Sequence, residues 1–497
     1  MPLIHYRYGA HLSKAQVSQL VEPHPVTLEL MNSWLEHHRV PTSSISVTHG
    51  GGWLTVTGML VSQANKMLGA SYQVYGTSGR NGTTILRTVG YALPTVLHPY
   101  VKTVVPTTYF GPTGAPQRTP KRHAVGADTP SRQLLSSRND EDEPEDEVDP
   151  SMLRSLYRTA AYVPAATDKN RLGVAGFLKN YPNKKDLTLF MEDCRGDAVD
   201  ATFNVVELNG DVYNPRRPTD EANQNIQYSQ AIAYPTPQTF YTTGGGVSIL
   251  PGSNLPAADD ADQVWLNYLL NDEESVPQTI SISYGNREKD VPFAYADAIC
   301  NLYARLGARG VSILVPSGNE GVGPDDEDFE DCIADKETGR VQFITDFPAS
   351  CMCITFLQLS LGDARAVASP CFLLHFYGFV GPYVTSVGGT TRKNPEVAAT
   401  FSGGGFSIYF PRPIYQNPAV PKFLEKLGNQ YDGMYRYVFS PRLDSYTAIL
   451  WFVQHGRSRY PRHICASCQL LYCLEAQGIR HEWHEPSCTS ALSFPLF

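Results

Sequence analysis

The 497-residue chain lacks several features that mark particular classes of protein. It has no apolar run long enough to span a bilayer. Lysine and arginine number 40 against 49 aspartate and glutamate, so the basic excess that nucleic-acid binding needs is missing. Ten cysteines at uneven spacing do not form a disulfide scaffold. No secretory signal pattern is visible after Met1. We therefore expect neither membrane nor nucleic-acid partners, and a length sufficient for two or more domains.

Residues 1–105 are predicted to form a small α+β unit. Apolar residues at Leu28, Met31, Trp34 and Leu35 have helical spacing, with Thr27 as the predicted N-cap. Alternating apolar and polar residues then predict pairs of strands separated by a second helix. The expected elements are strands at 45–48, 53–59, 72–75 and 85–89, and a helix at 62–68.

Residues 106–150 are predicted to be an acidic linker. Asp140 to Glu147 is a run of seven acids interrupted only by Pro144. Like charges repel and the segment has few apolar residues, so it is expected to stay solvated. Such a segment is accessible to a maturation protease, although a plain spacer remains an alternative.

The segment from residue 151 onward shows the pattern of a parallel sheet. A strand at 279–285 is followed by an amphipathic helix at 293–306, which Gly307 ends, and by a strand at 311–315. Strand, helix and strand in this order indicate a right-handed crossover between parallel strands. A buried strand at 172–178 and helices at 153–157 and 260–270 are also expected.

Two short stretches carry candidate functional residues. In the first, Glu221 and Asn225 are four residues apart, so on a helix they share one face and place a carboxylate beside an amide. The second, Ser317 to Gly321, follows a predicted strand, where functional groups of open parallel sheets collect. Asn319 in this stretch is an amide donor suited to an oxyanion, although Gly-Asn after a strand is also a common turn.

The first stretch, Glu-Ala-Asn-Gln-Asn-Ile-Gln-Tyr at 221–228 followed by Tyr-Pro-Thr-Pro at 234–237, resembles the acidic-pair helix of the sedolisin (serine-carboxyl) peptidases, which include tripeptidyl peptidase I. The resemblance implies that Glu221 is the general base of a serine nucleophile. Asn225 stands where the family has a supporting Asp, and Asn319 where the family has the Asp of its oxyanion hole. A carboxylate base of ordinary pKa implies activity below neutral pH.

The N-terminal unit resembles the sedolisin activation prodomain through the segments at 7–13, 52–54 and 87–91. The implied fold class is α/β, with a subtilisin-like parallel-sheet peptidase domain at 151–436 preceded by a ferredoxin-like α+β prodomain. The resemblance implies a fungal-type proenzyme that is secreted and monomeric, with peptide or protein substrates and its own prodomain as inhibitor. An N-glycosylation sequon at Asn81 is consistent with secretion.

Two segments depart from the family pattern. Residues 352–380 have no family counterpart and are interpreted as a probable insertion. A retained intron is its simplest source, and a genuine inserted hairpin is the alternative. Residues 437–497 lack the family's Arg-Gly-x-Pro-Asp-Val and Gly-Thr-Ser-x-x-x-Pro strings. Ser490 in Ser-Cys-Thr-Ser-Ala is the nearest candidate nucleophile. The tail also contains closely spaced Cys and His residues. Zinc sites have this pattern, and a segment translated out of its proper frame would also show scattered Cys and His residues.

The resemblance carries two further implications. Family members bind one calcium ion, whose ligands we do not find in this sequence. They often have a disulfide at a position that suggests Cys332 with Cys351, although buried free thiols are equally common. Two classes of function remain open: an acid serine peptidase, and a non-catalytic protein that binds peptides or a sibling peptidase.

Overall fold

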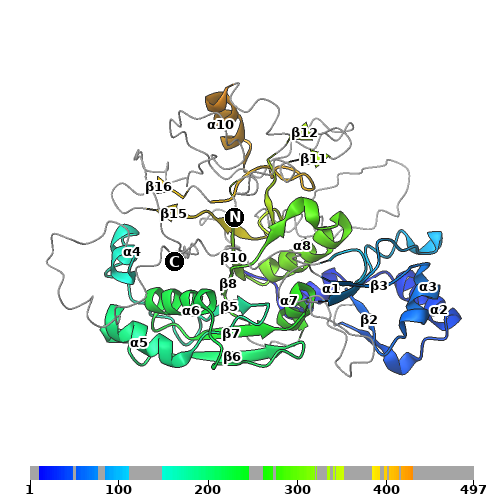
Figure 1. Ribbon diagram of the computed structural model, residues 1–497, viewed down its shortest axis with the longest axis horizontal. Coiled ribbons are helices and arrows are strands. Elements are labelled where there is room, and N and C mark those ends of the chain that lie inside the picture. Colours follow the sequence, from blue (N-terminus) through cyan, green and yellow to red (C-terminus); the bar gives the residue numbers. More distant parts are fainter. Residues whose placement is uncertain are drawn as a thin grey trace.

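The computed structural model describes residues 10–48, 52–76, 84–110, 148–245, 261–271, 276–319, 321, 333–335, 340–341, 343–351, 383–391, 397–399, 402–413 and 416–428. It consists of an N-terminal α+β unit and a larger α/β unit (Figure 1). The predicted insertion, the tail with Ser490, the Asn81 sequon and most of the linker lie outside the described residues.

The N-terminal unit has the predicted alternation of helices and strands. Its α2 helix begins one turn earlier than expected, because His24 caps it and Pro25 occupies the first helical position; the prediction of Thr27 as the cap was wrong. Strand β1 pairs antiparallel with β2, and β3 pairs antiparallel with β4. The elements are α1 Lys14–Leu20, α2 Pro25–His37, η1 Thr42–Ser44, β1 Ile45–Val47, β2 Leu54–Val56, α3 Val61–Leu68, β3 Gln73–Gly76, β4 Thr84–Arg87 and η2 Thr95–Leu97.

The α/β unit is built on a six-stranded sheet in which every neighbouring pair is parallel. Its spatial order is β14-β10-β8-β5-β7-β6, so the chain leaves β5 in one direction and later returns to add β8, β10 and β14 on the other side. The elements are α4 Pro150–Leu156, β5 Leu172–Gly176, α5 Lys184–Cys194, η3 Gly196–Ala198, β6 Phe203–Leu208, α6 Asp220–Ala233, β7 Gln238–Thr243, α7 Ala261–Asn271, β8 Thr279–Ile282, α8 Phe293–Ala308, β10 Ser312–Pro316 and β14 Thr385–Val387. The predicted parallel α/β sheet is confirmed.

Shorter elements surround the carboxyl ends of these strands. Strand β13 pairs antiparallel with β9, β11 with β12, and β15 with β16. Their bounds are β9 Asn286–Arg287, η4 Glu288–Asp290, β11 Ile333–Asp335, β12 Arg340–Val341, β13 Asp346–Phe347, β15 Thr390–Thr391, β16 Val397–Ala398 and α10 Ala419–Leu427.

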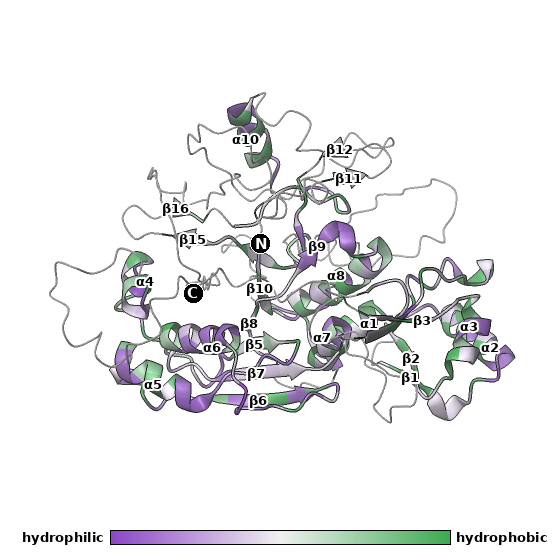
Figure 2. Ribbon diagram, in the orientation of Figure 1, coloured by the Kyte–Doolittle hydropathy of each residue, from purple (hydrophilic) through white to green (hydrophobic). Residues whose placement is uncertain are grey.

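Helices cover both faces of the sheet, as the alternation of side chains along its strands shows. Val174 and Phe240 belong to one apolar cluster together with residues of α5 and α6. Ala175 and Tyr241, one residue further along the same strands, belong to a second cluster with α7 and α8. Polar and apolar residues alternate along α5 and α6 in Figure 2, which fits helices that cover one face of a sheet. Among the described helices, none is both long and apolar enough to cross a bilayer.

A disulfide joins Cys300 on α8 to Cys351, which follows β13. The predicted pairing of Cys332 with Cys351 was therefore wrong. Two cysteines that flank a loop in the sequence do not show whether the fold brings another cysteine closer to one of them. Here the inward face of α8 places Cys300, which is 2% exposed, against the fully buried Cys351.

The N-terminal unit packs on α7 and α8. Its Leu12 N–H donates to the Ala308 carbonyl at 2.9 Å. The Tyr109 ring stacks on Tyr295 of α8 with 4.5 Å between ring centroids, and the Tyr109 hydroxyl accepts from Asn286 Nδ2 at 2.8 Å. Tyr109 is buried in the same apolar cluster as α8, so the two units share one core.

This interface also buries a cation. Arg305 of α8 is 5% exposed, and its Nε has no hydrogen-bond partner. Burial lowers the pKa of Arg305 to about 10. A Cβ on Gly52 of the N-terminal unit would lie 2.6 Å from Arg305 Nη1, so a larger residue there would require the guanidinium to move. Among the residues that the structure describes, no acidic side chain is paired with Arg305 at this interface.

Arg305→Met is expected to raise the free energy of unfolding of the full chain by about 1 to 3 kcal/mol, because an apolar side chain of similar length removes a desolvated charge. Thermal unfolding followed by circular dichroism measures the change. Lys102→Met is the control at the same interface: Lys102 pairs with Asp297 at 2.6 Å and is half exposed, so we expect a loss of at most about 1 kcal/mol. A lower stability for Arg305→Met would contradict the account.

Candidate active site

Helix α6 carries both residues of the predicted pair, Glu221 and Asn225, one helical turn apart. Asn223 holds the helix against α5. Its Nδ2 donates to Asp186 Oδ2 at 2.8 Å, and its Oδ1 accepts from the Asn183 N–H at 2.8 Å. The start of α6 is therefore fixed by contacts on the side of α5, which leaves Glu221 in a defined position.

Asn225 is 3% exposed, and its Oδ1 accepts from Ser283 Oγ at 3.1 Å. Ser283 directly follows β8. This hydrogen bond joins the motif helix to the carboxyl end of a central strand, which is where the sequence predicted functional groups to collect. Whether Asn225 also orients Glu221 stays a prediction.

The Glu221 carboxyl group is held in a desolvated position. Its Oε1 is buried and has no hydrogen-bond partner, and burial raises the pKa of Glu221 to about 7. An ordinary glutamate ionises near pH 4 to 5, roughly. Because only the ionised form can accept a proton, the structure moves the pH at which Glu221 becomes a base toward neutrality. The sequence-based expectation of activity below neutral pH assumed an ordinary pKa.

Tyr284 is a neighbour of Glu221 that the sequence did not single out. Its hydroxyl donates to the Phe177 carbonyl at 3.2 Å and accepts from Asn180 Nδ2 at 2.8 Å. Burial raises the pKa of Tyr284, and the negative charge of Glu221 raises it further. Its position immediately after Ser283 was the only available signal, since strand ends often carry such groups.

The second predicted stretch follows β10, the neighbour of β8 in the sheet. Ser317 N–H donates to the Val387 carbonyl at 2.9 Å, which joins this loop to β14. Gly318 has φ +112°, and a Cβ there would lie 2.2 Å from Asp346 Oδ2. Glycine is therefore required at 318 for two reasons. Asn319 comes next, with a partly exposed side chain.

A glycine-rich segment lies along this loop. Gly403 N–H donates to the Gly318 carbonyl at 2.9 Å, and Gly404 N–H to the Gly321 carbonyl at 3.1 Å. Ser317 Oγ and Ser402 Oγ are 3.2 Å apart, within hydrogen-bond distance. The backbone that presents Asn319 is thus supported from the segment at 402–404.

The structure brings together some of the predicted site and leaves other parts undescribed. Glu221 and Asn225 share α6. Ser283, which donates to Asn225, follows β8, and Asn319 follows the adjacent strand β10. Ser490 lies outside the described residues. Within the described part of the chain, no group of three or more His, Cys, Asp or Glu side chains could hold a metal ion.

Comparisons with known proteins identify relatives of this chain. Residues 3–110 match the family model described as Pro-kumamolisin, activation domain. The chain is 33% identical over 438 residues to a probable tripeptidyl-peptidase SED3 of Trichophyton verrucosum (strain HKI 0517), covering 87% of this chain and 66% of the relative. It is 32% identical over 443 residues to a tripeptidyl-peptidase SED3 of Arthroderma otae (strain ATCC MYA-4605 / CBS 113480), with the same coverages.

The chain belongs to the sedolisin family. It spans 66% of the length of these relatives. A solved structure, Pseudomonas sedolisin (serine-carboxyl proteinase) complexed with two molecules of pseudo-iodotyrostatin, is 18% identical and matches with a TM-score of 0.34 over 55% of this chain and 67% of that one. That score is too low to support a conclusion. Membership rests on the sequence relatives and on the activation-domain match, which overlaps the predicted prodomain at 1–105.

Proposed function

We propose that this chain is a serine-type peptidase, a tripeptidyl-peptidase or an endopeptidase, made as a proenzyme. In this proposal Glu221 is the general base, Asn225 occupies the position of the family Asp, and the Asn319 amide donates to the developing oxyanion. Ser490 remains the candidate nucleophile. The observation that carries the proposal is the desolvated Glu221 carboxyl group on α6, whose neighbour Asn225 is tied to the end of β8.

Each proposed role follows from ordinary chemistry. A serine hydroxyl attacks a peptide carbonyl only when a base removes its proton, and a carboxylate with a pKa of about 7 is a stronger base than an exposed glutamate. The carbonyl oxygen then gains negative charge, which an N–H donor stabilises. Asn319 offers such a donor at every pH, whereas an Asp in its place must be protonated to donate.

The proposal extends to the prodomain, the compartment and the metal. The N-terminal unit is proposed to inhibit the peptidase until the linker is cut. Its docking on α8 through Tyr109 and Leu12 supports this role. Secretion is proposed from the family resemblance and is supported by the Cys300–Cys351 disulfide, since disulfides persist in oxidising compartments. Calcium binding is a family implication, and no step above uses it.

The proposal is tested with a fluorogenic tripeptide amide whose amino terminus is free, from about pH 3 to about pH 8. The substrate is incubated with the purified full chain before and after limited proteolysis of the linker. An N-acetylated copy of the substrate is the matched control. Cleavage of the free substrate alone indicates a tripeptidyl-peptidase, and cleavage of both indicates an endopeptidase. Absence of cleavage of either substrate, and of a denatured protein substrate, would overturn the proposal.

A non-catalytic peptide-binding or peptidase-binding protein is the second candidate, and Asn225 is the observation that favours it. An amide at the family's carboxylate position cannot share a proton with Glu221. Affinity for peptides without turnover, measured by isothermal titration calorimetry, would support this candidate.

Asn225→Asp separates the two candidates further. The substitution places a second ionisable carboxyl group one turn from Glu221, and the two groups can then share a proton. For a peptidase we expect turnover of the tripeptide amide to rise about tenfold, measured as kcat below pH 6, roughly. Asn204→Asp is the matched control, because Asn204 is exposed on β6. An unchanged rate in Asn225→Asp would argue against a role for residue 225.

A further inference from the structure

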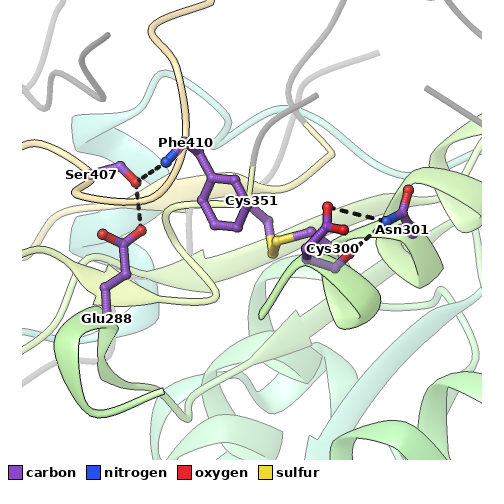
Figure 3. Close-up of a disulfide and its surroundings, with 7 residues drawn as sticks. Glu288, Cys300, Asn301, Cys351, Ser407 and Phe410 are labelled. Atoms are coloured by element: carbon purple, nitrogen blue, oxygen red, sulfur yellow. Dashed lines mark hydrogen bonds between the residues drawn. A yellow bond between two sulfur atoms is a disulfide. The ribbon is translucent and has the colours of Figure 1, made fainter. Parts of the chain in front are cut away.

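Glu288 is a buried carboxyl group that the proposed chemistry does not use. Its side chain is 0% exposed. Ser407 Oγ donates to Oε1 at 2.5 Å, and the Ile408 N–H donates to Oε2 at 2.6 Å. Figure 3 shows Glu288 and Ser407 facing each other across this contact. Residues 407–408 therefore engage both carboxylate oxygens. Burial raises the pKa of Glu288, and the Ser350 hydroxyl also acts on Glu288 and lowers its pKa.

Ser407 in turn fixes the shape of that segment. Its Oγ accepts from the Phe410 N–H at 2.8 Å and from the Tyr409 N–H at 3.1 Å. Because these two donors occupy the oxygen, the single hydroxyl proton of Ser407 is directed to Glu288. The contact thus requires an acceptor at Oε1.

Glu288 itself is held in place from several directions. Its N–H donates to the Thr345 carbonyl at 3.0 Å, next to the ladder between β9 and β13. The Cys300–Cys351 disulfide joins the chain just after β13 to α8 (Figure 3). The Tyr409 hydroxyl also donates to the Val291 carbonyl at 2.7 Å. Glu288 is therefore a fixed point to which residues 407–410 are attached.

The attached segment is continuous with the one that supports Asn319. Residues 402–404 bond to the loop at 317–321 through Gly403 and Gly404, and Phe406 forms a parallel bridge with Ile344. A Cβ on Gly403 would lie 1.9 Å from the Ser317 carbonyl oxygen, so the two backbones are in direct contact. Only Gly405 and Phe406 separate these contacts from Ser407.

Glu288 is also close along the chain to the other half of the site. Ser283, which donates to Asn225, and Tyr284, which neighbours Glu221, precede it by five and four residues. The segment at 283–288 is therefore in contact with both parts of the site. Its first residue, Ser283, contacts helix α6, and its last, Glu288, contacts residues 407–408, which continue from the segment that supports the Asn319 loop.

We propose that Glu288 is a positioning residue that sets the location of Asn319 relative to Glu221 by holding residues 402–408 against the loop at 317–321. The inference rests on the proposed function, and it identifies a determinant of oxyanion stabilisation outside the family motifs. Glu288 touches no reacting atom. It acts through Ser407, Ile408 and the glycine-rich segment.

Glu288→Gln tests this with almost no change in volume. An amide has only one acceptor oxygen, so its NH2 group would face either the Ser407 hydroxyl or the Ile408 N–H, and both are donors. We expect residues 402–408 to detach from position 288. Ser407→Ala is a milder second variant that removes one of the two contacts if Glu288→Gln does not fold. Glu207→Gln is the control, since Glu207 is exposed and accepts from the Tyr213 N–H.

Hydrogen–deuterium exchange of the full chain is the decisive measurement, because it does not depend on turnover. Amide exchange in Glu288→Gln is expected to be faster by at least about tenfold in peptides from 402–410 and also from 312–319, with no change in 220–233. Faster exchange in 402–410 alone would overturn the proposal, because Glu288 would then have only a local structural role.

Kinetics provide the second readout. If the wild type cleaves the tripeptide amide, Glu288→Gln is expected to lower kcat by at least about tenfold with KM unchanged, since a displaced oxyanion donor affects the transition state more than the bound substrate. An unchanged kcat would contradict the proposal. A wild type without turnover would refute the proposed function, and the exchange measurement would still decide the role of Glu288.

Discussion

Glu221→Gln is expected to lower turnover of the tripeptide amide by a factor of at least about 100, the usual size of a general-base contribution. Glutamine has the shape of glutamate but cannot accept a proton from a serine hydroxyl. The comparison is made with purified protein whose linker has been cut, at the pH of highest wild-type activity. Glu192→Gln on α5, an exposed position, is the control. Full activity in Glu221→Gln would refute the assignment of the base.

This loss is distinguishable from unfolding. The Glu221 Oε1 atom is buried without a partner, and burial raises its pKa to about 7. Above this pH the folded protein carries a desolvated charge, which the unfolded chain solvates. Glu221→Gln removes that charge, so at about pH 8 the variant is expected to be at least as stable as the wild type. Inactivity with retained thermal stability is therefore the expected combination.

Removal of the Cys300–Cys351 disulfide is expected to lower the free energy of unfolding by about 4 kcal/mol. The two cysteines are 51 residues apart, and a cross-link of this span restricts the unfolded chain by about that amount. The test is a Cys300→Ala, Cys351→Ala double variant, measured by chemical denaturation. Alanine is preferred to serine because both positions are almost fully buried and a hydroxyl there would lack a partner.

Cys194→Ala is the control for this experiment, since Cys194 is a partly exposed cysteine of α5 outside this disulfide. We expect it to change stability by less than about 1 kcal/mol. Equal stabilities for the double variant and the wild type would show that the bond is absent or that the segment at 343–351 does not contribute to folding.

Much of the sheet could be predicted from local patterns. The helical spacing within Phe293–Ala308 and the apolar run of Leu172–Gly176 predicted their type and approximate bounds. Helix α5 and strands β6 and β7 were missed, although Asn183 caps α5 and its buried Leu187 and Met191 have helical spacing. The sequence therefore contains the signal for α5.

The remaining features depend on contacts between distant segments. The partner of Cys351 was predicted wrongly because the sequence does not show that α8 lies beside the loop after β13. Glu288 was missed because a single glutamate after a strand end has no distinctive pattern. Its partners Ser407 and Ile408 lie about 120 residues further along the chain. Likewise, the pKa of Glu221 depends on burial that only the packed fold provides.

The most direct test of the account is the dependence of kcat/KM on pH for the wild-type chain. This quantity reports the pKa of the essential base in the free enzyme. The account predicts that kcat/KM rises with pH through a midpoint near the Glu221 value of about 7. A midpoint at about 4 to 5, the range of an ordinary glutamate, or a profile that does not depend on pH, would contradict a desolvated Glu221 as the base.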